Sequence, residues 1–137
     1  GWLEDNIAAC GKLADCYFQL GEPEKAFRAL LRSLVYDRPR AEICCRIGYY
    51  FFQKGDFRTA IFWYKLATDP EQTQQQMGFV HTAWHTWLPH LQLCVCYDRL
   101  GDYETAYWHN EMARKFWPES PQVLHNKRYL ESILNNK

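Results

Sequence analysis

The histidines are the side chains of this sequence whose spacing comes nearest to that of a metal site. His81 and His85 lie four residues apart, and two imidazoles at that spacing on one helix can hold a single metal ion. His90 follows five residues later, but no third ligand stands at the spacing of a zinc site. A metal-binding domain that uses His81 and His85 is therefore the least favoured of the hypotheses below, and no cofactor is expected.

Six cysteines could instead form disulfides or bind zinc. All of them lie inside helical apolar patterns rather than in loops, and no two have the spacing of a C-x-x-C motif. The closest pairs are Cys44 with Cys45 and Cys94 with Cys96. This pattern favours reduced cysteines that pack as small hydrophobic side chains, and it favours a cytoplasmic protein.

Motifs for catalysis are absent from the sequence. There is no nucleophile elbow of the form G-x-S-x-G, no phosphate-binding G-x-x-x-x-G-K-S/T loop and no D-x-D metal pair. His90 and His109 lie within helical patterns, where a buried or surface histidine is more common than a general base. We therefore expect that these 137 residues are not an enzyme.

Charge and hydropathy disfavour a nucleic-acid-binding protein and a membrane-spanning protein. Lys and Arg together number 16, as do Asp and Glu, so the formal net charge is zero and no positive field is present to attract nucleic acid. No apolar run approaches the roughly 18 to 20 residues of a membrane span, and the start of the chain lacks the basic and apolar parts of a signal peptide. Because a helical pattern opens at Trp2 without an initiator methionine, we expect a piece of a longer protein.

A six-residue phrase recurs three times and organises the chain. It begins at Gly21, Gly55 and Gly101, and each copy ends in an alanine. The first two glycines are 34 residues apart and the second two are 46 apart, which is one period of 34 plus an insertion of 12. Because a period of 34 is typical of stacked helical hairpins, the sequence predicts an all-helical repeat array with an insertion between its second and third units.

Small residues upstream of each glycine explain why a hairpin would form. Ala14, Gly48 and Cys94 would stand where the first helix of a hairpin meets the second, opposite the alanine that ends each phrase. An aromatic residue three positions later would wedge against the partner helix. The glycine would end the first helix in a left-handed conformation, and Asp56 and Asp102 are predicted to cap the second helices that follow.

Three frames upstream of the glycines share one pattern. They read Leu13-Ala14-x-x-Tyr17, Ile47-Gly48-x-x-Phe51 and Leu93-Cys94-x-x-Tyr97. These frames resemble the L-G-x-x-Y core of the tetratricopeptide (TPR) repeat family. The resemblance implies an all-α fold, a TPR-type α-α superhelix of three helix-turn-helix repeats plus a C-terminal capping helix, in a single domain that spans residues 1–137.

The repeats are expected at about 3–38, 40–68 and 87–118, the insertion at about 69–86 and the capping helix at about 121–135. First helices are expected at about 3–20, 40–54 and 87–100, and second helices at about 23–37, 57–68 and 103–117. In this frame five cysteines stand at shared or small-residue positions, which predicts packing roles for Cys10, Cys16, Cys44, Cys94 and Cys96. Only Cys45 is expected to face the concave groove.

TPR arrays expose their first helices on a concave surface, so the resemblance implies binding residues at fixed positions of each repeat. Two of these positions hold the small residues Ala8 and Gly11, and the others hold larger apolar, aromatic or acidic residues. The predicted groove residues are Asp15, Phe18, Glu42, Cys45, Tyr49, Phe52, Leu88, Leu91, Val95 and Asp98. Such a groove favours an extended or helical segment with apolar anchors and some basic character, and another domain or a second copy could cover it instead.

One known type of TPR ligand is disfavoured by this sequence. Chaperone-binding TPR domains hold a C-terminal carboxylate with Lys, Asn and Arg side chains at five positions of the groove. The corresponding residues here are Gly11, Asp15, Arg46, Leu88 and Gln92. Since only Arg46 can donate a charged hydrogen bond, we do not expect a carboxylate clamp.

The insertion carries a run of glutamines, Gln74 to Gln76, before its aromatic residues. We expect it to form a long loop or an extra turn over the edge of the groove, with Phe79, Trp84 and Trp87 packing it down. Insertions in repeat arrays often modify the binding face, so this segment is expected to shape the groove.

Three longer strings point to one particular TPR family. They run from Trp2 to Ile7 together with Leu13 to Tyr17, from Pro39 to Phe51, and from Pro89 to Tyr103, which includes Cys94-Val95-Cys96-Tyr97-Asp98-Arg99-Leu100-Gly101-Asp102-Tyr103. They resemble the C-terminal TPR region of bacterial family 2 glycosyltransferases, in which an upstream nucleotide-sugar domain carries the transfer chemistry.

This second resemblance implies a bacterial, cytoplasmic and non-catalytic interaction scaffold that binds or positions an acceptor or partner, or mediates self-association. Its partner would be a protein or peptide segment, the upstream catalytic domain, or a second copy in a homo-oligomer. A free-standing TPR adaptor is the alternative hypothesis. Neither hypothesis involves nucleic acid or a membrane span.

Overall fold

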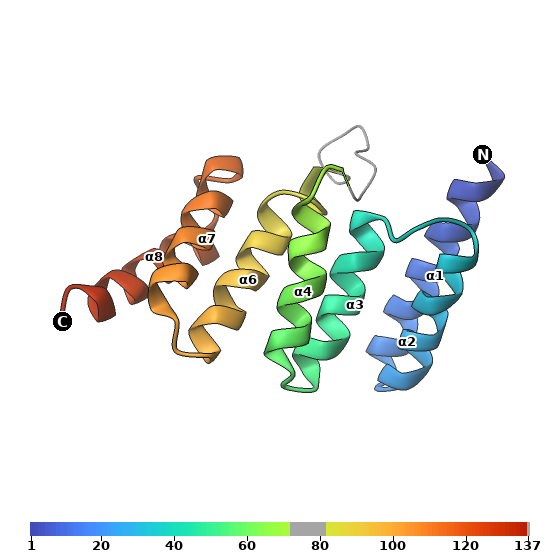
Figure 1. The fold of residues 1–137 in the computed structure, drawn as a ribbon, viewed down its shortest axis with the longest axis horizontal. Coiled ribbons are helices and arrows are strands. Elements are labelled where there is room, and N and C mark those ends of the chain that lie inside the picture. The colour runs from blue at the N-terminus through green and yellow to red at the C-terminus, as the bar shows by residue number, and fades with distance from the viewer. Residues whose placement is uncertain (72–81, 137) are drawn as a thin grey trace.

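The computed structural model describes residues 1–71 and 82–136. Within these ranges the chain forms seven α-helices and one 3₁₀ turn, and no strand. They are α1 (Trp2–Gln19), α2 (Pro23–Arg32), η1 (Ser33–Val35), α3 (Ala41–Gln53), α4 (Phe57–Thr68), α6 (Trp87–Arg99), α7 (Tyr103–Phe116) and α8 (Pro121–Leu134). The helices follow one another as hairpins in a row, with the termini at opposite ends (Figure 1). The predicted all-α array of helical hairpins is confirmed.

Each of the three hairpins turns at the glycine of the repeated phrase. Gly21, Gly55 and Gly101 have φ angles of 74°, 78° and 81°, in the left-handed region that glycine adopts without a steric cost. At the second turn, the amide of Asp56 donates to the carbonyl oxygen of Phe51 at 2.9 Å, which closes the end of α3. The glycine therefore sets where each first helix stops.

Aspartate caps begin two of the second helices, as predicted. The carboxylate of Asp56 accepts a hydrogen bond from the amide of Thr59, and that of Asp102 accepts one from the amide of Thr105, both at 3.2 Å. The first repeat differs, because the side chain of Glu22 makes no capping hydrogen bond at the start of α2.

Small side chains bring the two helices of a hairpin together. Ala14 of α1 and Ala26 of α2 are both completely buried. In the second hairpin, a Cβ atom placed on Gly48 would lie 3.0 Å from the ring of Tyr64 on α4, which is closer than side chains normally approach. Ala60, also on α4, is completely buried. The predicted close contact of these helices is confirmed.

Helix α3 lies between two hydrophobic clusters and joins them. Ile43 and Ile47 pack with the first hairpin, in one cluster with Leu30 of α2. Cys44 packs in a second cluster that also holds Leu93 of α6. Because one helix serves both clusters, the core continues along the row of hairpins rather than forming separate centres.

Helix α8 covers the last hairpin. Its Leu130 is almost completely buried and packs with Cys94 of α6 and Ala106 of α7. The side-chain amide of Asn110 on α7, itself completely buried, donates to the carbonyl oxygen of Val123 at 2.9 Å. These contacts fix α8 against the apolar end of the array.

Two details differ from the sequence predictions. The α-helical part of α2 ends at Arg32 rather than near residue 37, because the chain tightens there into the 3₁₀ turn η1. The predicted packing role of Cys16 is wrong, since its side chain is exposed. The equivalent Cys96 is buried in the cluster that contains Ala60 of α4. Among the described residues no helix precedes α1, so nothing covers Cys16 in the same way.

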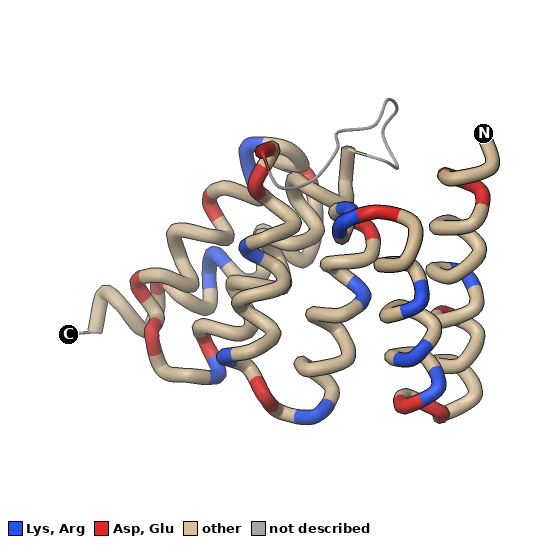
Figure 2. Tube along the Cα trace, turned by 45° about the vertical axis from the view of Figure 1, so that its right-hand side comes forward, with Lys and Arg blue, Asp and Glu red and all other residues tan. Residues whose placement is uncertain are grey.

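Charged residues of both signs are spread along the whole row of helices (Figure 2). None of the described helices is both long and apolar enough to pass through a lipid bilayer. The glutamine run Gln74 to Gln76, Phe79 and His81 lie outside the described residues, and so does most of the predicted insertion.

Candidate functional site

A cavity of about 520 Å³ lies between the first helices of the three hairpins, and we call it the groove cavity. Helices α1, α3 and α6 supply most of its wall, together with one residue of α4 and Trp84, which precedes α6. Its lining residues are Asp15, Phe18, Gln19, Cys45, Arg46, Tyr49, Tyr64, Trp84, Trp87, Leu88, Leu91 and Gln92. Of the predicted groove residues it contains Asp15, Phe18, Cys45, Tyr49, Leu88 and Leu91. Their role in binding stays a prediction.

The other predicted groove residues, Glu42, Phe52, Val95 and Asp98, do not line this cavity. The ring of Phe52 packs edge-on against Phe57 at the start of α4, with 5.5 Å between the ring centres. Val95 and Asp98 border a much smaller hollow beside α8, where Asp98 accepts a hydrogen bond from the hydroxyl of Tyr129 at 2.9 Å. Val95 and Asp98 of α6 thus border α8 rather than the groove cavity.

Arg46 is the central charged residue of the groove cavity. Its Nε and Nη2 atoms donate to the two carboxylate oxygens of Asp15, both at 2.9 Å, and Nη1 donates to the carbonyl oxygen of Glu42 at 3.3 Å. The guanidinium carbon lies 4.5 Å from the ring centre of Trp84, a cation–π contact. The positive charge is thus matched by Asp15 and covered by an aromatic ring.

The Arg46 contacts join α1, α3 and the segment before α6 into one wall. Sequence reasoning placed Arg46 at a carboxylate-clamp position of the groove but did not include it among the predicted binding residues. Its partner Asp15 is 31 residues away in the chain, and Trp84 belongs to the segment that breaks the repeat period. The repeat frame placed Asp15 and Arg46 on the same surface, but it contained no signal for the contact with Trp84.

Cys45 lines the groove cavity but does not offer a reactive thiol. Its side chain is almost completely buried, and Sγ donates to the carbonyl oxygen of Trp84 at 3.2 Å. Burial raises the pKa of this thiol well above its usual value, so the thiol stays protonated at neutral pH. The residue serves to hold Trp84 in place.

Aromatic side chains form the floor and the rim of the groove cavity. The hydroxyl of Tyr64, buried at the floor, accepts a hydrogen bond from the side-chain amide of Gln92 at 3.2 Å. Burial raises the pKa of this phenol, which therefore stays neutral. At the rim Phe18 meets Tyr49 edge-on, with 5.0 Å between the ring centres. The cavity is thus lined by neutral and apolar groups beside one compensated ion pair.

Two histidines form a buried pair outside the groove cavity. His90 of α6 and His109 of α7 approach with 3.0 Å between their Nδ1 atoms, so one nitrogen donates and the other accepts. Burial lowers the pKa of each to about 4, and the proximity of His90 contributes further to the shift of His109. Both imidazoles are therefore neutral at pH 7.

This pairing bears on the metal hypothesis. His90 faces His109 rather than His85, and His81 lies outside the described residues. Within residues 1–71 and 82–136, no three side chains of His, Cys, Asp or Glu are grouped so that they could hold a metal ion. A metal site at His81 and His85 stays an untested prediction.

Comparison with known proteins agrees with this architecture. A family model described as tetratricopeptide repeat matches residues 7–38 and 41–69, the segments that contain the first two hairpins. This match supports the predicted resemblance to the TPR family over those residues. No curated protein matches the sequence.

Several solved structures share the fold. The first TPR of Spaghetti (RPAP3), bound to an HSP90 peptide, has a TM-score of 0.78 at 13% identity, over 96% of this chain and 94% of that one. The second TPR domain of human RPAP3, in complex with an HSP70 peptide, has a TM-score of 0.74 at 12% identity, over 94% and 98%. A structure of MamA has a TM-score of 0.75 at 18% identity, over 95% and 69%. The chain therefore has a TPR-type superhelical fold.

Proposed function

We propose that this chain is a non-catalytic protein-interaction scaffold whose groove cavity receives a segment of a partner protein. The observation that carries the proposal is the chemistry of the cavity wall, in which aromatic and aliphatic side chains surround a compensated ion pair. A cavity of about 520 Å³ has room for one or two large apolar side chains. Two proteins of similar fold hold peptides: the first TPR of Spaghetti (RPAP3) holds an HSP90 peptide, and the second TPR domain of human RPAP3 holds an HSP70 peptide.

The ligand that suits this cavity is an extended or helical segment with an apolar anchor. Tyr49, Leu88 and Leu91 would contact the anchor, and the half-exposed carboxylate of Asp15 favours a Lys or Arg beside it. A C-terminal carboxylate does not suit it, because the guanidinium of Arg46 is already bound to Asp15. We therefore propose an internal segment, not a chain end, as the bound form.

A peptide-display selection on the immobilised chain tests this proposal. Selected peptides should carry an apolar anchor near a basic residue, and the double substitution Tyr49→Ala, Leu91→Ala should weaken their binding about tenfold or more. The matched control is Phe52→Ala, because Phe52 is an aromatic residue of the same helix that lies outside the cavity. If the selected peptides bind the double variant as tightly as the unaltered chain, the groove cavity is not the binding site.

The wider context that we propose is a bacterial, cytoplasmic glycosyltransferase of family 2, in which this module binds an acceptor, the catalytic domain or a second copy. The strings of residues described above support this proposal. Sequencing the gene on the 5′ side of the Gly1 codon tests it: a nucleotide-sugar domain with a D-x-D motif supports the transferase. Its absence would favour the free-standing adaptor.

A further inference from the structure

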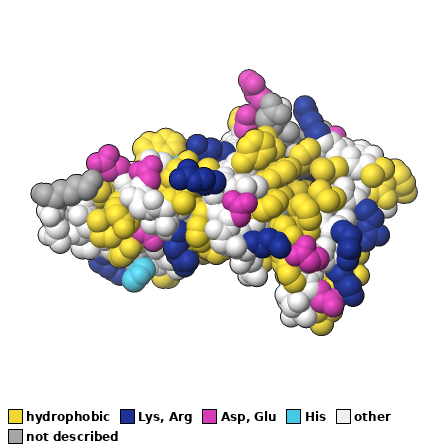
Figure 3. All heavy atoms as spheres, turned by 60° about the horizontal axis from the view of Figure 1, so that its bottom comes forward, with side chains coloured by type: hydrophobic (Ala, Val, Ile, Leu, Met, Phe, Trp, Pro, Cys, Tyr) yellow, Lys and Arg dark blue, Asp and Glu magenta, His cyan; other side chains and the backbone are white. Residues whose placement is uncertain are grey.

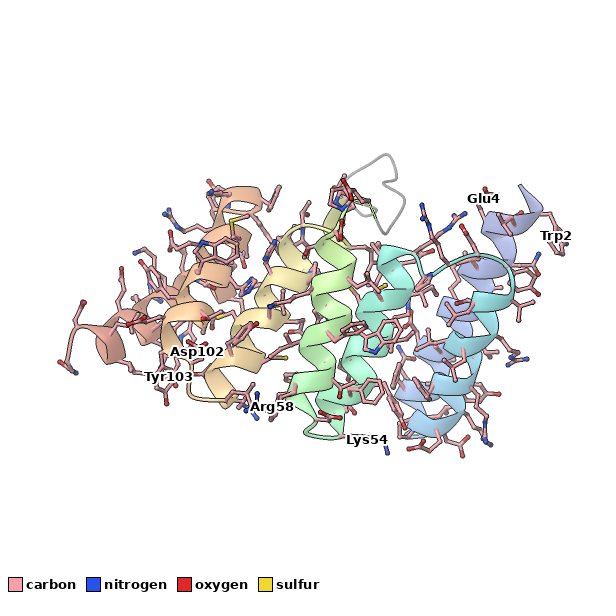
Figure 4. The ribbon with its side chains drawn as sticks, in the orientation of Figure 1. Trp2, Glu4, Lys54, Arg58, Asp102 and Tyr103 are labelled. Carbon is pink, nitrogen blue, oxygen red and sulfur yellow. The ribbon has the colours of Figure 1, made fainter. Side chains whose placement is uncertain are left out.

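A stripe of exposed apolar side chains follows one face of α1. Trp2 and Leu20 are each 72% exposed and Leu13 is 39% exposed, and Ala9 and Cys16 between them are exposed as well. Their spacing of seven, four, three and four residues places them on the same side of a helix. Trp2 projects outward at the N-terminal end of the molecule (Figure 4). Exposure of a continuous apolar stripe indicates a surface that contacts another element.

The other hairpins show what covers this face within the array. At the positions that correspond to Ala9, Leu13 and Cys16, α3 and α6 carry buried residues, namely Ile43, Ile47 and Tyr50, and Pro89, Leu93 and Cys96. The residues that correspond to Leu20, namely Lys54 and Leu100, are exposed. The second helix of the preceding hairpin covers the buried residues. On α3, Tyr50 stacks on Phe27 of α2 with 4.3 Å between the ring centres. On α6, Leu93 packs with Ala60 of α4. A helix is thus the kind of element that packs on this face within the array.

Helix α2 gives this edge a positive charge. Lys25, Arg28 and Arg32 border a hollow of about 630 Å³ that reaches Tyr17 of α1 and the exposed Val35. Lys25 is paired with Glu22 at 2.8 Å, so the positive charge of the edge comes mainly from the two arginines. Lys and Arg positions follow one another down this helix beside α1, which carries charges of both signs (Figure 2). In the space-filling view, Lys and Arg side chains at the N-terminal end flank hydrophobic areas (Figure 3).

We propose that this N-terminal edge, formed by the apolar stripe of α1 and the basic row of α2, binds an acidic amphipathic helix. Its apolar face would cover Leu13 and Cys16, as α4 covers the equivalent Leu93 and Cys96 of α6, and would extend to Leu20. Its acidic flank would face Arg28 and Arg32, neither of which forms an ion pair within the described part of the chain. Two copies meeting through this edge would bring like charges together, which disfavours a symmetric dimer as the occupant.

A synthetic helix tests the proposal. The probe is a labelled peptide of 18 residues, the length of α1, with leucine along one face and glutamate along one flank. A second peptide carries lysine in place of each glutamate. Fluorescence anisotropy should show binding of the acidic peptide, weaker binding at high salt, and binding of the basic peptide that is about tenfold weaker or more.

Exposed positions provide variants that leave the fold intact. The substitution Leu13→Glu with Leu20→Glu should abolish binding, and Arg28→Glu with Arg32→Glu should reverse the preference in favour of the basic peptide. The matched control is Phe62→Glu on α4, because Phe62 is 61% exposed and belongs to neither surface. Circular dichroism verifies that every variant stays helical.

Binding at the N-terminal edge can be distinguished from binding in the groove cavity. Tyr49→Ala with Leu91→Ala should leave binding of the acidic helix unchanged, so failure at one surface does not imply failure at the other. Equal binding of the acidic and basic peptides, or full binding by the Leu13→Glu, Leu20→Glu variant, would overturn the proposal. So would a dimer in sedimentation equilibrium that Leu20→Glu dissociates, because the occupant would then be a second copy.

Discussion

At the scale of single residues, two buried glycines inside helices differ in what surrounds them. A Cβ atom on Gly48 would lie 3.0 to 3.1 Å from three ring atoms of Tyr64, whose ring is buried and hydrogen-bonded to Gln92. A Cβ atom on Gly11 would instead meet the guanidinium of Arg46 at 3.0 Å, the end of a flexible side chain. Substitution by alanine should therefore have opposite effects on the stability of the fold at these two glycines.

We expect Gly48→Ala to lower the free energy of unfolding by about 1 kcal/mol or more, because overpacking against Tyr64 outweighs the better helix propensity of alanine. Gly11→Ala should raise it by up to about 1 kcal/mol, since Arg46 can move by a few tenths of an ångström. Urea unfolding followed by circular dichroism measures both. Stabilisation by Gly48→Ala would contradict the close contact between α3 and α4.

The histidine pair predicts how stability depends on pH. The folded pKa values of His90 and His109 are both about 4, against about 6.5 for an unperturbed histidine. Between these values the unfolded chain binds protons that the folded chain does not, so the free energy of unfolding falls as the pH falls from about 6.5 to about 4. Each histidine contributes no more than about 3 kcal/mol to this loss.

The control for this prediction is His109→Gln, which keeps a polar side chain opposite His90 but cannot titrate. Urea unfolding across the same pH range should show a shallower loss of stability in the variant. The hydrogen bond from Tyr50 lowers the pKa of Glu24, so protonation of Glu24 in acid lowers the stability of both proteins equally. The difference between the two proteins therefore reports the contribution of the His109 imidazole. Equal slopes in the two proteins would show that the pair titrates normally.

Residue by residue, the sequence predicted the groove only where the repeat frame was intact. Tyr49 and Leu91 occupy regular positions of first helices, and both line the groove cavity. Asp98 also holds a regular position, but the hydroxyl of Tyr129 on α8 binds it, and the repeat frame contains no information about α8. The contact of Arg46 with Trp84 depends on an insertion that follows no period. The repeat pattern therefore predicted which first-helix positions could line the groove cavity. Contacts with α8 and with the insertion, which the pattern does not contain, determine which of them do.

At the scale of helices, the aspartates that cap α4 and α7 should each contribute to stability. Asp56→Ala and Asp102→Ala should each lower the free energy of unfolding by about 1 kcal/mol, because each leaves a helix-starting amide without its acceptor. Glu22→Asp at the equivalent position of α2 should stabilise the chain by up to about 1 kcal/mol, since it supplies the side-chain cap that α2 lacks.

Thermal unfolding monitored by circular dichroism checks the three variants. Glu22→Ala is the control, because Glu22 makes no capping bond and loses only an exposed ion pair with Lys25 on substitution. A loss in Glu22→Ala as large as in Asp56→Ala would refute the capping argument.

Helix positions were predictable because their ends depend on local chemistry. A glycine in the left-handed conformation stops each first helix, and an aspartate next to it starts the following one in two of three hairpins. The end of α2 depends instead on a hydrogen bond from the hydroxyl of Ser33 to the carbonyl oxygen of Leu30, at 2.6 Å, within a 3₁₀ turn. The repeat pattern contains no signal for such a turn.

At the scale of the whole molecule, the two ends of the array differ. Helix α8 packs over α7 and buries Leu130, whereas the corresponding apolar side of α1 stays exposed. In a repeat array each unit contacts only its neighbours, so the stability of an end depends on its own contacts. The exposed end should consequently be the part of the molecule that a bound helix stabilises most, through the same mass-action effect that any ligand of the folded state exerts.

Nearest-neighbour packing also predicts that damage at one end stays local. Leu130→Ala removes a buried side chain from the contact of α8 with Cys94 and Ala106, at a cost of about 2 to 5 kcal/mol. We expect faster hydrogen exchange in α7 and α8 while the amides of α1 and α2 keep their protection. Leu30→Ala, which removes the same side chain from the cluster around Ile47, is the mirror-image control and should expose α1 and α2 instead. If either variant lost protection uniformly along the chain, the array would unfold as a single cooperative unit, and binding at the N-terminal edge would then stabilise the groove cavity as much as the edge itself.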